Sequence, residues 1–126
     1  MYIYLAQAYT GKEKQAVSEA CKFLAQYQND ECKPAYAIYS PIVHWHYVAI
    51  NHKLPTNSAF WKRENESMLR YCEELWVLLS VPGWQNSKGI RFEIETALRF
   101  CKPIRYVEYI DNKLYMFPFP PAHAYE

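Results

Sequence analysis

Short apolar runs alternate along the chain with longer segments whose apolar residues recur at intervals of three and four. The apolar runs predict strands over residues 2–6, 36–39, 75–80, 103–110 and 114–117. The periodic segments predict helices over residues 13–28, 58–72 and 87–101. Because strands and helices follow one another through short connections, we expect an α/β fold with helices on both faces of the sheet. The expected architecture is a three-layer sandwich around a mainly parallel, flavodoxin-like or Rossmann-like sheet of about five strands.

The remaining segments complete a single domain over residues 1–126, since no repeat, low-complexity tract or linker interrupts the chain. A long loop is expected over residues 42–57. The proline-rich tail FPFPPAHAYE predicts no regular structure, and its aromatic rings are expected to pack onto another surface. Cys21, Cys72 and Cys101 fall on apolar helical positions and are expected to be buried free thiols.

Composition narrows the classes of function. The chain carries 14 basic and 13 acidic residues, a net charge of +1, which does not favour binding of a nucleic acid polymer. Its 12 Tyr, 6 Phe and 4 Trp exceed the needs of a small core and indicate a ligand cleft, a subunit interface, or both. The cysteines form no CxxC pair, Met1 leads directly into a strand, and no apolar run approaches the roughly 20 residues that span a bilayer. We therefore expect a cytoplasmic protein that does not bind membranes.

One strand-to-helix connection carries the strongest chemical signal. The predicted strand 75–80 is followed by a loop with Pro82 and Gly83, a polar turn that ends at Ser87, and a helix that opens near Gly89. Free N–H groups and the positive end of the helix dipole favour an anion there, and Glu93 lies in the early turns of the helix. The alternative is an ordinary connection in which Ser87 caps the helix and Glu93 lies on the surface.

Ligands of parallel sheets bind at the carboxyl ends of the strands. Those ends are expected to gather the following polar and aromatic side chains: Tyr9, Ser40, His44, His46, Trp84, Ser87 and Glu93. The spacing of His44 and His46 suggests a metal site, but His52 and His123 do not complete a set of ligands, so we expect neither a metal nor another cofactor. GxGxxG, P-loop and GxSxG motifs are missing from the sequence.

Asn65 is a polar residue on the inward stripe of its predicted helix. A polar side chain in that position needs a hydrogen-bond partner. The partner is either a structural group in the core or a bound ligand, and both interpretations stay open.

The segments YLAQAYT, YSPIVHWHYVA, LPTNSAFW, MLRYCEELWVL and PGWQNSKGIRFEIETALRFCKPI together resemble the DUF1937 family, which is found often in phages and bacteria. This family belongs to the nucleoside 2-deoxyribosyltransferase-like superfamily. The resemblance spans residues 2–107, and the run GW-x-x-S-x-G-x-x-x-E-x-x-x-A is its specific part. Better-known members of the superfamily have a flavodoxin-like fold and cleave the bond between a base and a ribose or deoxyribose without a metal.

The resemblance implies that the protein cleaves the N-glycosidic bond, or exchanges the base, of a nucleoside or nucleoside 5′-monophosphate. Glu93 would attack the anomeric carbon, and Ser87 with the Gly89 region would hold the 5′-phosphate. Tyr9 or Trp84 would stack on the base, and Ser40 is a further candidate for substrate binding.

The superfamily places an aspartate, which protonates the leaving base, near the position of Asn65. An amide cannot supply that proton, so the acid role would pass to His44 or His46. The same substitution supports an alternative function, a non-catalytic nucleotide-binding protein that acts as a sensor or sponge. The resemblance also implies a homodimer or larger homo-oligomer in which the aromatic tail of one chain closes the site of its neighbour.

Overall fold

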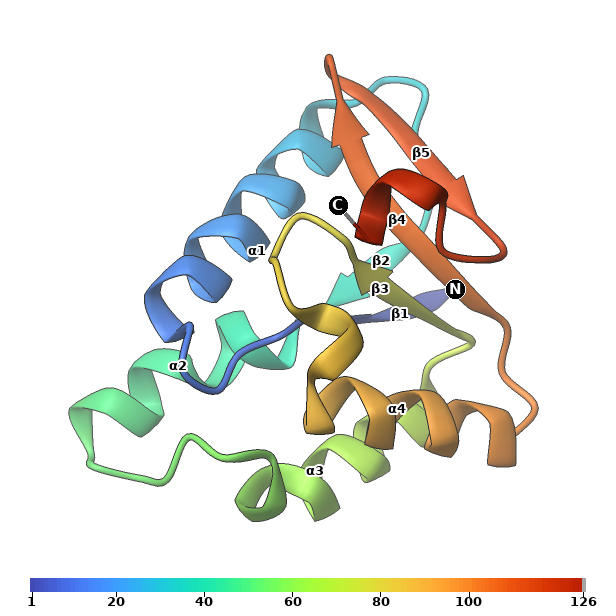
Figure 1. Ribbon diagram of the computed structural model, residues 1–126. Helices are drawn as coiled ribbons and strands as arrows, with labels where there is room; N and C mark the ends of the chain where they lie inside the picture. The colour runs from blue at the N-terminus through green and yellow to red at the C-terminus, as the bar shows by residue number, and fades with distance from the viewer. Residues whose placement is uncertain (126) are drawn as a thin grey trace.

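The computed structural model describes residues 1–125 and contains a five-stranded sheet in the order β2-β1-β3-β4-β5 (Figure 1). The strands are β1 (Tyr2–Ala6), β2 (Ala37–Tyr39), β3 (Glu74–Leu78), β4 (Ile104–Ile110) and β5 (Lys113–Phe117). β2, β1, β3 and β4 run parallel to one another, whereas β5 runs antiparallel to β4. The sheet is therefore mixed, which corrects the expectation of a mainly parallel sheet.

The connection between β4 and β5 explains this difference. Only Asp111 and Asn112 separate the two strands, and both have positive φ angles, 51° and 63°. Such a two-residue turn makes a hairpin, while a parallel neighbour would need a crossover of roughly a dozen residues. The sequence predicts this turn, and its two-residue length sets the antiparallel direction of β5.

Helices cover both faces of the sheet (Figure 1). The helices are α1 (Glu13–Asn29), α2 (Pro41–Asn51), α3 (Ser58–Tyr71) and α4 (Lys88–Arg99). Two short 3₁₀ turns follow later elements, η1 (Trp84–Asn86) and η2 (Ala122–Tyr125). α1 lies on one face, α3 and α4 pack against each other on the other face, and α2 contacts α1 and β1.

The central strands alternate between two hydrophobic clusters. Along β1, Ile3 faces the cluster that contains Phe23 of α1, and Tyr4 faces the cluster that contains Leu69 and Ile90 of α3 and α4. All five of these residues are buried. Successive side chains of a strand point to opposite faces, so a strand covered on both sides is apolar throughout its length. This is why the strands are predicted well from short continuous apolar runs.

The expected loop over residues 42–57 is wrong for most of its length, because α2 begins at Pro41 and ends at Asn51. Ser40 is the N-cap of α2, and its side-chain oxygen accepts a hydrogen bond from the Val43 amide at 3.2 Å. Proline suits the first helical position because its fixed φ is already helical and its missing N–H would have no partner there. Ser40-Pro41 therefore starts a helix as well as ending a strand.

The expectation of buried thiols holds only for Cys72. Cys21 is exposed because the buried stripe of α1 passes through its neighbours Ala20 and Phe23. Cys101 is exposed beyond the end of α4, where the chain turns through a left-handed conformation with φ 56°.

The C-terminal tail folds back onto the sheet of its own chain (Figure 1). Contrary to the expectation of an irregular tail, it contains the 3₁₀ turn η2. His123 is hydrogen-bonded to Glu108 of β4, and the Tyr125 ring lies 5.8 Å from the Trp84 ring, centroid to centroid. His123 and Tyr125 of the tail thus contact β4 and η1 of the same chain, whereas Phe119 is exposed.

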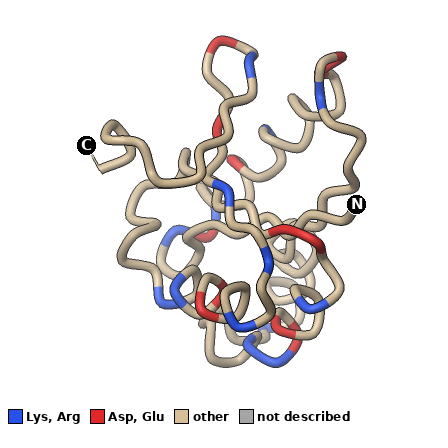
Figure 2. The backbone as a smooth tube through the Cα atoms, turned by 90° about the vertical axis from the view of Figure 1, so that its right-hand side faces the viewer, with Lys and Arg blue, Asp and Glu red and all other residues tan. Residues whose placement is uncertain are grey.

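Charges of both signs are interspersed around the helices (Figure 2). Within the described part of the chain, no helix combines the length and the apolar character that crossing a membrane requires.

Candidate functional site

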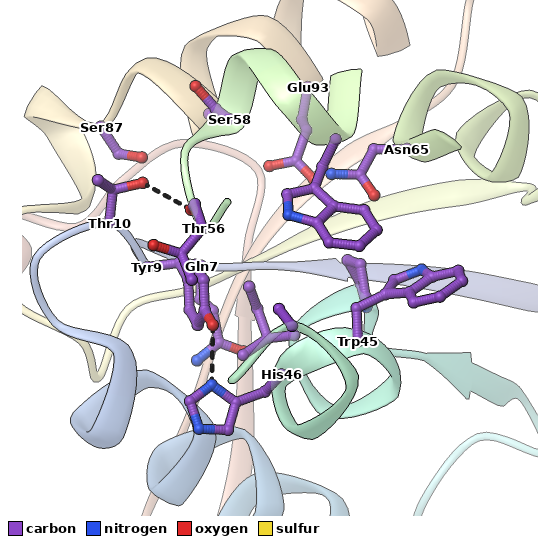
Figure 3. Close-up of a pocket in the computed structure, with 15 residues that line it drawn as sticks. Gln7, Tyr9, Thr10, Trp45, His46, Thr56, Ser58, Asn65, Ser87 and Glu93 are labelled. Carbon is purple, nitrogen blue, oxygen red and sulfur yellow. Dashed lines mark hydrogen bonds between the residues drawn. The ribbon is translucent and has the colours of Figure 1, made fainter. Parts of the chain in front are cut away.

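A pocket lies beyond the carboxyl end of β1 (Figure 3). β1 is the strand from which the chain goes first to β2 on one side and later to β3 on the other. Crevices of α/β sheets form at such a point because the crossovers before and after it lie on opposite faces. The lining residues come from the loop after β1, α2, the loop between α2 and α3, α3, and the start of α4. They are Gln7, Tyr9, Thr10, Pro41, Ile42, Trp45, His46, Ala49, Thr56, Ser58, Trp61, Asn65, Ser87, Gly89 and Glu93.

Glu93 carries the acidic group of this pocket. Its side chain is only 6% exposed, and it points from α4 into the pocket (Figure 3). Burial raises the pKa of Glu93 to about 8, and the nearby hydroxyl of Tyr4 offsets part of that rise. In this structure the Glu93 carboxyl is therefore mainly protonated at neutral pH. The alternative that Glu93 lies on the surface is wrong.

One end of the pocket is rich in hydroxyl groups. Figure 3 shows Thr10, Ser58 and Ser87 at this end. Ser87 is the N-cap of α4, and its Oγ accepts a hydrogen bond from the Ile90 amide at 3.3 Å. A Cβ on Gly89 would lie 3.4 Å from Ser58 Cβ and 3.7 Å from Ser87 Oγ, so a larger residue would narrow this end. Hydroxyls and the N–H groups of the first helical turn can together hold an anion.

The opposite end is aromatic. Trp45 of α2 and Trp61 of α3 lie with their ring centroids 5.0 Å apart and their planes inclined by 34°. The Trp61 indole N–H donates a hydrogen bond of 2.8 Å to the Pro55 carbonyl, which holds the ring in place. Sequence reasoning missed both tryptophans. Residues 42–57 were expected to form a loop, and only the helix α2 places Trp45 in the pocket.

Asn65 of α3 also points into the pocket (Figure 3). Its Oδ1 is buried and, among residues 1–125, lacks a hydrogen-bond partner. The described part of the protein therefore offers Asn65 Oδ1 no hydrogen-bond partner in the core, and a bound ligand remains as the partner. Gln7, which the sequence places at this edge of the sheet without a chemical role, donates to the Ala16 carbonyl, while its Oε1 is likewise buried without a partner in the described chain.

The two histidines of the HWH motif have separate environments. His46 is 7% exposed, lines the pocket, and its Nδ1 lies 2.8 Å from the Tyr9 hydroxyl. Burial and the nearby Glu13 raise the pKa of Tyr9. His44 is exposed and contacts Tyr39 instead. Residues two positions apart on a helix point in different directions, so α2 separates the pair.

A metal site is not formed by these groups. Across residues 1–125, no three or more His, Cys, Asp and Glu side chains gather closely enough to hold a metal ion.

Three residues of the expected cluster do not line the pocket. Ser40 caps α2, and His44 lies outside, as described above. Trp84 is buried in the core, where its ring centroid lies 5.6 Å from that of Tyr106. The structure brings together Tyr9, His46, Asn65, Ser87, Gly89 and Glu93 from the sequence-based list.

Comparison with known proteins adds one result. A family model described as "Domain of unknown function (DUF1937)" matches residues 1–109. Neither the curated proteins nor the solved structures contain a match to this chain. Since the family model covers most of its length, the chain belongs to the DUF1937 family.

Proposed function

We propose that this protein cleaves the N-glycosidic bond of a nucleoside 5′-monophosphate or nucleoside, or exchanges its base, by a covalent mechanism. The observation that carries the proposal is the buried carboxyl of Glu93 in a pocket with hydroxyls at one end and indoles at the other. Departure of a base leaves an oxocarbenium-like sugar, which a nearby carboxylate stabilises or captures as an ester. The ionised Glu93 would form the bond to the anomeric carbon as the base leaves with the bonding electrons. Water or a second base would then release the sugar.

We further infer membership of the nucleoside 2-deoxyribosyltransferase-like superfamily, with a three-layer flavodoxin-like arrangement. The strand order 2-1-3-4-5 is the order of flavodoxin-like folds and supports this inference. The antiparallel direction of β5 is a departure from the all-parallel form.

The departing base needs a proton, and we assign its source to His46. His46 lines the pocket and contacts the Tyr9 hydroxyl, whereas His44 lies outside and the Asn65 amide has no proton to titrate. His46→Asn, which keeps a polar group near the Tyr9 hydroxyl, should slow release of an ordinary base about 10²-fold.

The same variant should have a much smaller effect on a p-nitrophenyl riboside 5′-phosphate, because nitrophenolate leaves without a proton. His44→Asn is the matched control and should leave both rates nearly unchanged. Equal losses on the two substrates would show that His46 is not the proton donor.

Ser87 is proposed to bind the 5′-phosphate. Ser87→Ala should weaken turnover of monophosphates about 10- to 100-fold, the effect of one hydrogen bond to a charged group, and change turnover of nucleosides little. The substitution also removes the N-cap of α4. Asn57→Ala removes the N-cap of α3 without changing a residue that lines the pocket, so it controls for lost stability. Equal losses for monophosphates and nucleosides would leave Ser87 as a helix cap alone.

The second candidate is a non-catalytic nucleotide-binding protein. It is favoured by the raised pKa of Glu93, about 8, because a protonated carboxyl is not a nucleophile. The amide at Asn65 adds to this argument, since it supplies no acid.

Chromatography of free base tests the two candidates together. The protein would be incubated with ribo- and deoxyribonucleosides and with their 5′-monophosphates, carrying ordinary and modified bases. Release of base supports the enzyme and identifies its substrate. Thermal stabilisation by nucleotides without release would overturn the catalytic proposal in favour of the binding protein.

A further inference from the structure

We propose that Trp45 and Trp61 form the platform for the base, that Asn65 reads the edge of that base, and that the nucleotide lies with its phosphate at the opposite end. The proposal rests on the proposed function, because it assigns subsites to the same ligand. It replaces Trp84 and Tyr9, the stacking residues suggested by the sequence.

The geometry of the indoles determines how a base would stack. Two rings whose centroids are 5.0 Å apart leave no room for a base between them, since a sandwiched ring needs about 7 Å. The base would therefore lie on the indole surface that faces the pocket. Both tryptophans are half-buried, come from different helices and are packed against each other, so the surface is formed before the ligand arrives.

Asn65 supplies the polar part of this subsite. Its buried Oδ1 accepts no hydrogen bond from any residue in the described range 1–125, although burying a polar atom without a partner is costly. A ligand N–H would satisfy this oxygen, and the amide NH₂ could donate to a neighbouring acceptor. The edges of nucleobases present donors beside acceptors, whereas an ionised phosphate presents mainly acceptors. Ribose hydroxyls can also donate and accept, so the position of Asn65 on the same side of the pocket as Trp45 assigns it to the base (Figure 3).

The positions of the other side chains set the direction of the nucleotide. Figure 3 shows Trp45 and Asn65 on one side of the pocket and the hydroxyls of Thr10, Ser58 and Ser87 on the other. A base on the indoles and a phosphate among the hydroxyls would place the sugar between them.

Trp84 and Tyr9, the other two candidates for stacking on the base, lie away from the indole end of the pocket. Trp84 is buried against Tyr106 and Tyr125, outside the pocket. Tyr9 lies beside Thr10 and Thr56, on the side of the pocket away from Trp45 and Asn65, and its hydroxyl is hydrogen-bonded to His46 (Figure 3).

The test measures binding in the Glu93→Gln background, so that no substrate is consumed. Calorimetry would compare AMP, GMP, CMP and UMP with ribose 5-phosphate, which has their phosphate and sugar but no base. Trp61→Ala and Asn65→Ala should each weaken the best-bound nucleotide about 10- to 100-fold and change the affinity for ribose 5-phosphate less than twofold. Trp61→Phe should restore much of the nucleotide affinity, because phenylalanine still stacks.

Trp84→Phe is the matched control and should leave both affinities unchanged. Circular dichroism would confirm that each variant is folded. Equal weakening of nucleotide and ribose 5-phosphate, unchanged nucleotide affinity in both alanine variants, or failure of all four nucleotides to bind would each overturn the subsite assignment. If the native protein releases no base but the expected binding pattern holds, the catalytic proposal fails while the subsite stands.

Discussion

Replacing Glu93 by glutamine should reduce release of free base by about 10³-fold or more while nucleotide affinity changes little. Glutamine keeps the size and polarity of the side chain but cannot form a glycosyl ester. The measurement is initial rates of base release beside calorimetric binding of the same nucleotide. Glu95→Gln, on the exposed side of the same helix, is the matched control and should retain full activity.

The pH dependence of kcat/KM of the native protein is a second test of Glu93 as the nucleophile. With the p-nitrophenyl riboside 5′-phosphate, which needs no proton from His46, kcat/KM should rise with pH toward the Glu93 pKa of about 8, because the nucleophile must be ionised. With this substrate, a profile that falls through this range would exclude the ionised Glu93 as the nucleophile. Loss of nucleotide binding together with activity in Glu93→Gln would also contradict the proposed role.

The stability of the native protein should fall relative to that of Glu93→Gln as pH rises from 5 to 7. The pKa of Glu93 is about 8 in the folded protein against an ordinary value of 4.5, so the folded state holds a proton that the unfolded state releases. The stabilisation is complete below about pH 4.5 and is lost as pH rises through 8. Linkage gives a difference on the order of 2 to 3 kcal/mol between pH 5 and pH 7.

Urea unfolding of both proteins at a series of pH values measures this difference, since other titrating groups affect both equally. Glu95→Gln again serves as the control and should follow the native curve. Parallel curves for the native protein and Glu93→Gln would show that the Glu93 carboxyl is not held protonated by burial. If the curves diverge as expected, burial of the Glu93 carboxyl lowers the stability of the folded protein at neutral pH. Functional sites commonly reduce stability in this way.

Local signals in the sequence predicted several features correctly. Continuous apolar runs placed the central strands, because strands buried on both faces need apolar residues at every position. Ser87, followed by a segment with helical periodicity, correctly predicted the start of α4. This prediction also put Glu93 about one and a half turns into that helix, after the end of a strand. The resemblance to the DUF1937 family rested on the same run of residues, and the family match agrees with it.

The errors arose where one local pattern suits two structures. Ser40-Pro41 can end a strand or begin a helix, and only packing of α2 on α1 and β1 selects the helix. The same choice separates His46, which enters the pocket, from His44, which does not. Trp84 follows a strand end as a ligand residue would, but its indole is buried against Tyr106.

The sequence by itself determined the alternation of strands and helices, the family, and the presence of a glutamate at the start of a helix beside a strand end. The tertiary structure decided which face of that helix is buried, that burial raises the pKa of Glu93, and that Trp45, Trp61 and Asn65 share a pocket with it. These residues lie on three different helices. Short-range patterns reflect the preferences of neighbouring residues, whereas the environment of a side chain depends on which distant elements pack against it.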